Sequence, residues 1–496
     1  MKVILIDIPI TEDVDNGYTK LHKEIIFPSL GLYYLKEYAL KKLNDIDIYV
    51  YNLTKCTFNE AADKIVSISP DLIGISCYTD RRALVYKFIK TIKTINPKII
   101  SVLGGPHVTA LPVQTIENNN FIDFIVLGEG ELTFTELLGK LKNHQDDFEK
   151  INGLCFIKNG KTIITEKREP LLNLDEFPYP KFETLPNDLI KFNHYDDRFS
   201  FKGKKISELK SMSIITSRGC PFKCSYCSTS AFWGNKVRYR SAENVIEEIE
   251  YLYKNHDVKF INIIDDAFTI NKNRVMEICN GIIKKNMDIC WICETNVKTI
   301  DDEMLSLMKK SGCFAINYGV ESGSPVILKN INKHISQSEI INAVKSAEKY
   351  NIIPDIFLMV GNQGENNTTI SETLNILKTA KPSSGGWGIL TIFPGTELYK
   401  NCLKSGYISE NYWVSDKSSP FYLKEQPYLK LQIFLNKIRC FFLFKNKNYK
   451  LWLRYKLLEI RDNIFLISGI KLSFKKGIQF QKNNKTRFPE KKIEYS

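Results

Sequence analysis

Three cysteines lie close together in the stretch TSRGCPFKCSYC (216–227). Cys220, Cys224 and Cys227 fall within eight positions, and the glycine and proline beside Cys220 keep the segment from forming a regular helix. Structural zinc sites use four protein ligands, and no fourth Cys or His follows at the usual short spacing. A four-iron, four-sulfur cluster held by three thiolates leaves one iron open to an outside ligand. The spacing favours such a cluster over a zinc site with a distant fourth ligand or three free thiols.

The cysteines directly follow an apolar run that is typical of a buried strand, SMSIITS (211–217). Five more such runs follow, with amphipathic helical patterns between them. Six strand–helix repeats predict about three quarters of an α/β barrel, whose chemistry lies where strands end and loops begin. The cysteine loop occupies such a position. The five later strands are expected at 260–268, 289–297, 313–322, 355–363 and 388–396.

The N-terminal part of the chain, 1–140, also alternates short apolar runs with amphipathic stretches. This alternation predicts a parallel, doubly wound sheet with a ligand crevice at the carboxyl ends of its strands. The turns GGPH (104–107) and GEGE (128–131) fall at two of those ends. Their glycines either make tight turns or let a ligand approach the backbone. The strands are expected at 2–8, 46–51, 72–78, 98–105 and 124–130.

The pattern divides the chain into four segments. Residues 1–140 form the first α/β domain, and 141–205 a linker with a hairpin that turns at Asn159-Gly160. Residues 206–405 form the barrel, and 406–496 a basic helical segment. The stretch from 421 to 496 holds 18 Lys and Arg against 5 Asp and Glu, which accounts for the whole net charge of +13. This segment is interpreted as a helical cap over the barrel mouth with a solvated basic end, or as a surface for an anionic membrane or an acidic substrate.

Composition sets further bounds. A chain of 496 residues with 43% hydrophobic content is long enough for two or more domains. It begins without a secretory pattern and holds no apolar run of roughly 18 residues, so we expect a cytoplasmic protein whose twelve cysteines are reduced thiols or metal ligands. We expect no nucleic-acid partner, because no base-stacking motif accompanies the basic charge.

The CxxxCxxC motif, with Tyr226 before its last cysteine, resembles the radical S-adenosylmethionine (SAM) enzymes. DDAF (265–268), GVESG (319–323) and FPGTELY (393–399) resemble their cobalamin-dependent branch. PSLGLYYL, GGPH and GEGELTF resemble that branch's cobalamin-binding domain. The resemblance covers residues 1–400. It implies an α/β fold, in which a Rossmann-like cobalamin-binding domain precedes a partial (β/α)6 TIM-type barrel and a helical C-terminal segment.

The resemblance also implies the cofactors and the reaction. A [4Fe–4S] cluster on Cys220, Cys224 and Cys227 would cleave SAM to a 5'-deoxyadenosyl radical, and the protein would exclude water from that radical. With cobalamin, the expected activity is methyl transfer to an unactivated carbon of a small molecule, a lipid or a natural product. The expected partner is an electron donor such as flavodoxin or ferredoxin.

Position in the motifs points to the SAM contacts. Asp265, Asp266, Glu321 and Ser322 are the candidates for the amino, carboxylate and ribose groups of SAM. The alternatives are an N-cap on the following helix for the two aspartates, and an ion pair inside the barrel for Glu321. Tyr226 is expected over the cluster or the adenine, or in the core.

The cobalamin side departs from the methionine-synthase pattern. None of the six histidines has an Asp two residues before it, so the Asp-x-His-x-x-Gly motif is absent. His107 is either a cobalt ligand or a histidine that hydrogen-bonds within its own turn. The residues expected to receive the corrin and its nucleotide tail are Ser76, Gly104, Gly105, His107, Gly128 and Glu129.

Several functions remain open on these residues. The same cofactors support radical cyclisation or rearrangement. A methylthiotransferase would need three more cluster cysteines near the N-terminus, and Cys56, Cys77 and Cys155 are badly spaced for this. A regulator that binds cobalamin and uses the cluster as a redox sensor is a further hypothesis. Cys279, Cys290, Cys293 and Cys313 are expected as small core residues.

Overall fold

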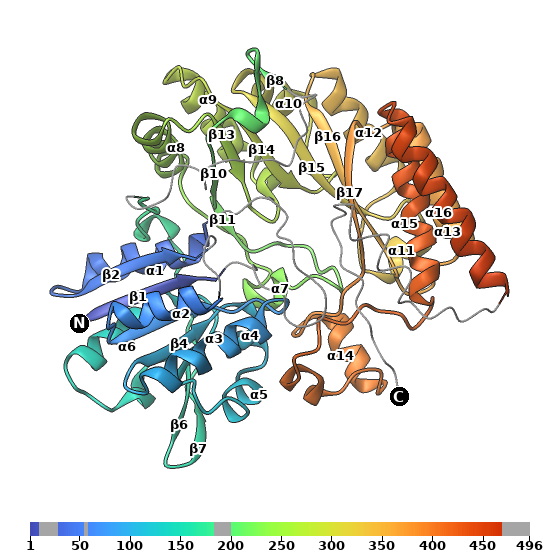
Figure 1. Ribbon diagram of the computed structural model, residues 1–496. Coiled ribbons are helices and arrows are strands. Elements are labelled where there is room, and N and C mark those ends of the chain that lie inside the picture. Colours follow the sequence, from blue (N-terminus) through green and yellow to red (C-terminus); the bar gives the residue numbers. More distant parts are fainter. Residues whose placement is uncertain (9–27, 54–57, 183–199, 469–496) are drawn as a thin grey trace.

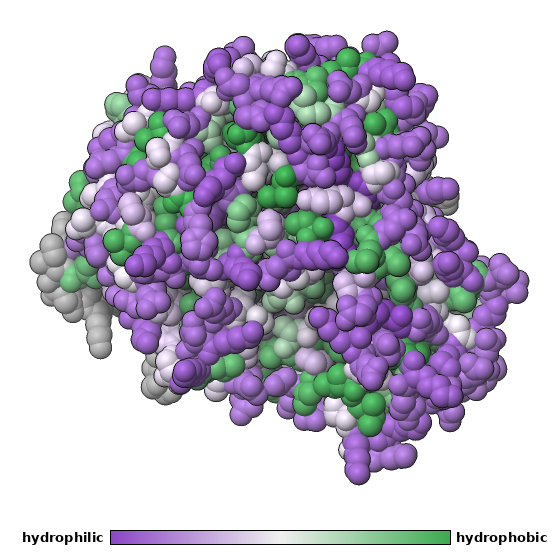
Figure 2. Space-filling view, turned by 180° about the vertical axis from the view of Figure 1, so that it is seen from behind, coloured by the Kyte–Doolittle hydropathy of each residue, from purple (hydrophilic) through white to green (hydrophobic). Residues whose placement is uncertain are grey.

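The computed structural model describes residues 1–8, 28–53, 58–182 and 200–468. The chain folds into two mainly parallel sheets, one from each half of the sequence, as the strand–helix alternation predicts (Figure 1). Figure 2 shows that hydrophilic side chains cover most of one face of the molecule and that apolar side chains gather in smaller patches.

The first sheet has the order β2-β1-β3-β4-β5-β6-β7, and its first five strands are parallel. Alternate residues of β1 face opposite ways: Val3 and Leu5 belong to one apolar cluster, and Ile4 and Ile6 to another. The first cluster is covered by α1 (Leu30–Lys42) and α6 (Gly130–Lys142), and the second by α2 (Phe58–Ser67) and α3 (Arg82–Ile95). The predicted doubly wound domain is therefore confirmed. The five strands are β1 (Lys2–Asp7), β2 (Asp47–Asn52), β3 (Leu72–Ser76), β4 (Ile100–Gly104) and β5 (Phe124–Val126).

The hairpin expected in the linker is present as β6 (Leu154–Lys158) and β7 (Lys161–Ile164). It does not stand apart from the first domain, because β6 pairs antiparallel with β5 and so extends the N-terminal sheet. Asn159 and Gly160 both have positive φ at its two-residue turn, as a tight hairpin requires.

The second sheet is an open, all-parallel partial barrel with the strands in sequence order, β10-β13-β14-β15-β16-β17. Its outer face packs on α8 (Ala242–His256), α9 (Lys272–Lys284), α10 (Asp302–Lys310), α12 (Gln337–Lys349) and α13 (Asn367–Ala380). Cys279, Cys290, Cys293 and Cys313 are buried in the core, as predicted. The strands are β10 (Ser211–Ile214), β13 (Phe260–Ile263), β14 (Cys290–Thr295), β15 (Cys313–Glu321), β16 (Ile353–Val360) and β17 (Ser384–Ile389).

The C-terminal helices do not cap the barrel mouth, contrary to the sequence-based expectation. α15 (Tyr428–Lys445) lies along β17 and beside α13, with Phe442 stacked on Trp387, and α16 (Tyr449–Ser468) packs on α15 (Figure 1). The segment before them, which includes α14 (Glu397–Lys404), contacts both the barrel and the N-terminal domain. Within the described residues no helix is both long enough and apolar enough to cross a membrane.

Candidate active site

The stem of the cysteine loop is fixed by a carboxylate. Asp265, at the end of β13, accepts hydrogen bonds from the Thr216 backbone N–H (2.6 Å), the Thr216 hydroxyl (2.5 Å) and the Ser217 hydroxyl (2.6 Å). Arg274 donates to the Thr216 carbonyl at 2.7 Å. Asp265 is 1% exposed, and Asn271 caps the following helix, so neither the SAM contact nor the N-cap predicted for Asp265 describes its observed contacts. It holds the backbone that leads into the cysteines.

The loop then turns at Gly219, which has φ of +97° and lies so close to the chain that a Cβ would meet the Lys236 carbonyl oxygen at 2.5 Å. Two backbone bonds anchor its far side. The Ser225 N–H donates to the Ile331 carbonyl at 3.0 Å, and the Leu398 N–H donates to the Ser225 carbonyl at 2.8 Å. The cysteines are thus held between strand β11 (Ser217–Arg218), the barrel and the α14 segment.

The thiols of the loop are partly sheltered. Cys224 is buried, and Cys220 and Cys227 are half-buried. Burial raises the pKa of Cys220 to about 11 and also raises that of Cys224. A thiol ligates metal only as the thiolate, so loading a metal centre here must release protons. The described residues contain no group of three or more His, Cys, Asp or Glu side chains placed to hold a metal ion. The thiolates of a four-iron cluster each bind a different iron, and the donor set fits such a cluster.

Glu321 stands beside these thiols in a strained backbone position. Its φ is +65°, rare for a residue with a side chain, and the pairing of β15 with β16 shifts register between Gly319 and Glu321. Its carboxylate lies 3.5 Å from the Lys333 ammonium and hydrogen-bonds the Tyr226 hydroxyl. Burial and then the Glu321 charge raise the pKa of Tyr226. The predicted ion pair is therefore present, and strain at such a position is typical of functional sites.

Asp266 differs from its neighbour because the residue is exposed. It accepts a hydrogen bond from the Thr229 hydroxyl at 2.7 Å, and burial of its carboxyl group raises its pKa. Its carboxylate thus contacts the segment that follows Cys227, while part of the residue is open to solvent. Asp266 remains available to a ligand.

Glu294 was missed at the sequence level. It ends β14 inside the barrel, in register with Asn317, to which it hydrogen-bonds. Burial, followed by the charges of Asp266, Asp355 and Glu321, raises the pKa of Glu294 to about 7. The barrel interior therefore carries a carboxyl group that titrates near neutral pH.

Ser322, a predicted SAM contact, is occupied elsewhere. It is 2% exposed, its hydroxyl lies 3.2 Å from that of Thr373, and it accepts from the Ser324 N–H at 3.1 Å. These bonds close the turn between β15 and α11 (Pro325–Asn330) against α13. The observed role of Ser322 is structural.

Gly104 and Gly128 lie at the carboxyl edge of the N-terminal sheet. Among the described residues, a Cβ at Gly128, where φ is +67°, would meet nothing within 4 Å, and one at Gly104 would meet only the Val126 carbonyl oxygen, at 3.8 Å. Gly105 is different, because a Cβ there would lie 2.9 Å from the Ser76 hydroxyl. Its φ of +99° and its lack of a Cβ allow the turn after β4 to lie close to Ser76 and Cys77 at the end of β3. Among the described residues, no side chain crowds Gly104 or Gly128, as the close approach of a corrin to this part of the backbone would require.

Glu129, predicted at the corrin, instead joins the two halves of the protein. Arg218 donates to Glu129 at 2.6 Å and to Glu131, and Arg238 also pairs with Glu129. All four side chains are nearly buried. Burial disfavours the charge on Arg218, but Glu131 and Glu129 more than offset this, so the pKa of Arg218 is raised. We call these four residues the Arg218 clamp.

His107 is enclosed by protein. It is 1% exposed, its Nδ1 lies 3.2 Å from the Thr79 hydroxyl, and its ring packs edge-on against Trp413. Burial, aided by the Arg82 charge, lowers the pKa of His107 to about 3. These contacts disfavour cobalt ligation, but the hydrogen bond goes to Thr79 after β3 and not to a residue of the histidine's own turn.

Family comparisons agree with this geometry. Residues 214–377 match the radical SAM superfamily model, and residues 24–138 match the B12 binding domain model. A protein of Pyrococcus horikoshii, named only as an uncharacterized methyltransferase, is 33% identical over 407 residues, 82% of this chain and 84% of that protein. The chain belongs to the cobalamin-dependent radical SAM enzymes. Family membership implies a [4Fe–4S] cluster, SAM and cobalamin as its cofactors.

Two more distant proteins share parts of this family pattern. The anaerobic magnesium-protoporphyrin IX monomethyl ester cyclase of Rubrivivax gelatinosus is 27% identical over 74% of this chain and 64% of its own length. The structure of the radical SAM methyltransferase TsrM from Kitasatospora setae matches with a TM-score of 0.66 at 18% identity, over 82% of this chain and 76% of that one. At that identity the match supports the fold alone.

Proposed function

We propose that this cobalamin-dependent radical SAM enzyme transfers a methyl group to an unactivated carbon of a small molecule, a lipid or a natural product. The observation that carries the proposal is the Arg218 clamp. Arg218 lies two residues before Cys220 and binds both carboxylates of the GEGE turn, next to Gly128. The clamp would therefore fix the loop that is proposed to hold the cluster relative to the turn that is proposed to lie beside cobalamin.

The proposed roles of the residues follow from their contacts. Cys220, Cys224 and Cys227 would hold the cluster, which supplies the electron that cleaves SAM, while cobalamin supplies the methyl group. Asp266 and Glu321 are proposed SAM contacts, because the first is exposed and the second sits beside the thiols with Tyr226. Ser76, Gly104 and Gly128 are proposed to receive the corrin and its tail.

We further propose that flavodoxin or ferredoxin supplies the electron and that the enzyme works in the cytoplasm. Both proposals extend the family's chemistry. The domain limits near 140, 205 and 405 are likewise proposals, with the hairpin β6–β7 assigned to the first domain by its pairing with β5.

The test is mass spectrometry of nucleoside products. The protein is reconstituted anaerobically with iron, sulfide and cobalamin, and is then given SAM and a strong reductant. Formation of both 5'-deoxyadenosine and S-adenosylhomocysteine supports methyl transfer. Neither product, from protein with a full cluster, would contradict it and favour the redox sensor.

Radical cyclisation is the second candidate. Sequence similarity to the anaerobic cyclase favours it over methylthiotransfer and over redox sensing. Release of 5'-deoxyadenosine without S-adenosylhomocysteine, from protein with bound cobalamin, is the result expected for this reaction. A methylthiotransferase is less well supported, because Cys77 and Cys155 are fully buried. Cys56 lies outside the described residues.

A further inference from the structure

Helix α16 carries an apolar stripe on its outward side. Tyr449, Leu453, Leu457 and Ile460 are 54%, 54%, 57% and 50% exposed. At about 100° of rotation per residue these four side chains fall within an arc of about 80°. Large exposed apolar side chains that gather on one surface indicate an interaction site, whereas scattered ones do not. In Figure 1 this helix lies at the outer edge of the molecule, away from the N-terminal sheet.

Cationic side chains border the stripe on both sides. By the same rotation, Lys450, Arg454 and Arg461 follow it on one side, and Lys456 lies on the other. The stretch 428–468 contains nine Lys and Arg against two acidic residues. Both acidic residues are paired within the helix: Lys456 donates to Glu459 at 2.9 Å, and Arg461 donates to Asp462 at 2.6 Å. These pairs engage Lys456 and Arg461, so the bordering cations outside these two pairs are Lys450 and Arg454, and nine cations against two acidic residues leave the stretch a net charge of +7.

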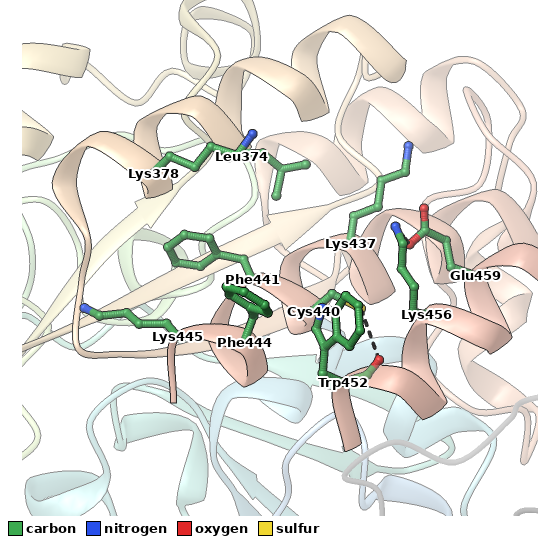
Figure 3. A pocket seen from close by; sticks show the side chains of 10 residues that line it. All are labelled: Leu374, Lys378, Lys437, Cys440, Phe441, Phe444, Lys445, Trp452, Lys456 and Glu459. Carbon is green, nitrogen blue, oxygen red and sulfur yellow. Dashed lines mark hydrogen bonds and ion pairs between the residues drawn. The ribbon is translucent and has the colours of Figure 1, made fainter. Parts of the chain in front are cut away.

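A groove of about 480 Å³ adjoins this surface between α13, α15 and α16 (Figure 3). Its apolar wall includes Phe441, Phe444 and Trp452, and Phe444 is 57% exposed. Its lining also includes the cations Lys378, Lys437, Lys445 and Lys456. Apolar walls beside ammonium groups suit an amphiphile with an anionic head, since the chain can enter the groove while the head pairs with lysine.

We propose that the α15–α16 hairpin rests on an anionic membrane surface, with the stripe of α16 inserted between the headgroups. Charge complementarity selects this occupant. A second copy of the chain would bring two cationic surfaces together, whereas anionic headgroups neutralise the cations beside the stripe. An amphipathic helix with a basic border is the usual form of such an interfacial contact. This proposal is independent of the reaction that the barrel catalyses.

The test is sedimentation of the full-length protein with vesicles of phosphatidylcholine and phosphatidylserine in a two-to-one ratio, compared with pure phosphatidylcholine. The apolar variant is Leu453→Gln with Leu457→Gln and Ile460→Gln. The matched control is Ile157→Gln with Ile164→Gln on the β6–β7 hairpin, where these side chains are 43% and 48% exposed. We expect tight binding only to the anionic vesicles, a loss of at least tenfold in the apolar variant, and unchanged binding in the control.

The electrostatic part is tested with Lys450→Gln and Arg454→Gln. Each lost cation should weaken binding about fivefold at low salt, and NaCl at about 0.5 M should weaken binding of the wild type. Equal binding to both vesicles, or an apolar variant that binds like the wild type, would overturn the proposal. A concentration-dependent dimer that the apolar variant abolishes, without vesicle binding, would assign the stripe to a second copy and would also overturn it.

Discussion

Arg218 and Arg82 are both buried where the N-terminal domain meets the rest of the chain, and their charges are satisfied in opposite ways. Arg218 binds the carboxylates of Glu129 and Glu131. Arg82, at the start of α3, instead donates to backbone carbonyls: Thr79 at 3.0 Å, Trp413 at 3.3 Å, Ser415 at 3.0 Å, and Lys417. Burial lowers the pKa of Arg82, whereas the carboxylates raise that of Arg218.

The difference indicates two tasks. Two carboxylates fix both the position and the orientation of a guanidinium group. Because Arg218 lies two residues before Cys220, the clamp also fixes the start of the cysteine loop. Its ring contacts add to this, because Arg218 lies 4.9 Å from the Phe177 ring and 5.0 Å from that of Trp233. Arg82 donates to the Thr79 carbonyl and to three carbonyls of the segment 413–417. Its guanidinium carbon also lies 5.1 Å from the centroid of the Trp413 ring. Arg82 therefore holds the segment 413–417 in place, and Trp413 of that segment packs against His107.

The largest expected effect is that of Arg218→Met. It leaves the buried carboxylate of Glu131 without its cation and Glu129 with Arg238 alone, and such a change costs about 3–5 kcal/mol. Urea unfolding of the apo-protein should show this loss. Adding Glu131→Gln should restore at least half of it, because the stranded charge is removed while Glu129 keeps Arg238.

Lys272 provides the matched control for this prediction. It also pairs with two carboxylates, those of Asp301 and Glu303, but at the surface. Lys272→Met should cost less than about 1 kcal/mol. Equal losses for Lys272→Met and Arg218→Met would show that burial of the clamp contributes nothing.

Asp265→Asn should come next. An amide offers one acceptor oxygen, and its NH2 group would face donors of Thr216 or Ser217, so we expect a loss of about 2–3 kcal/mol. Iron bound per chain after reconstitution should fall as well. The neighbouring Asp266→Asn is the control, expected to cost less than about 1 kcal/mol and to retain iron. A variant Asp265→Asn with wild-type stability and iron content would contradict the role of Asp265 as the stem of the loop.

Arg82→Met should cost about 2 kcal/mol, because water can reach some of the carbonyls that it leaves. The readout that separates the two arginines is cluster assembly. Iron content should remain at the wild-type level in Arg82→Met and fall in Arg218→Met. Loss of iron in both variants would remove the distinction drawn between the two contacts.

Sequence patterns predicted the two sheets well, because apolar periodicity reports which residues are buried. The weakest strand prediction was the last one. It was placed at 388–396, whereas β17 spans Ser384–Ile389. Its first residues, Ser384, Gly385 and Gly386, have little β propensity, and the strand forms because Phe442 of α15 fills the space beside Gly385. A contact between positions so far apart in the chain leaves no local signal.

The site was predicted less completely. Motif position identified the region of Glu321 and Asp266, but it could not separate Asp266 from Asp265, since adjacent side chains on the same turn face opposite ways. Arg218 lies within the stretch TSRGCPFKCSYC (216–227), but its partners Glu131 and Glu129 come from a turn 87 and 89 residues earlier in the chain. Lys333 and Glu294 belong to no motif, and only the assembled barrel brings them to the site.

The smallest expected effect is a pH dependence of the free energy of unfolding, and it concerns only the domain contact formed by Arg82 and His107. His107 has a pKa of about 3 in the folded protein and about 6.5 when unfolded, so below pH 6.5 the unfolded chain binds one proton more. The part of the stability that depends on His107 is therefore complete above pH 6.5 and falls as pH decreases towards 3. Between pH 7 and pH 5.5 we expect His107 to lower the free energy of unfolding by about 1 kcal/mol, measured as the difference between the wild type and His107→Gln, because the raised pKa of Glu294 acts in the opposite sense in both proteins.

His107→Gln should remove this part of the pH dependence, while His144→Asn, at an exposed position, should retain it. Each variant is compared with itself across the pH range, so any pH-independent cost of the substitution cancels. Arg218→Met should keep the wild-type slope, because the clamp lies on the other contact between the domains. If His107→Gln keeps the wild-type slope of unfolding free energy against pH, another group titrates at this interface. The contact formed by Arg82 would then not be the acid-sensitive one.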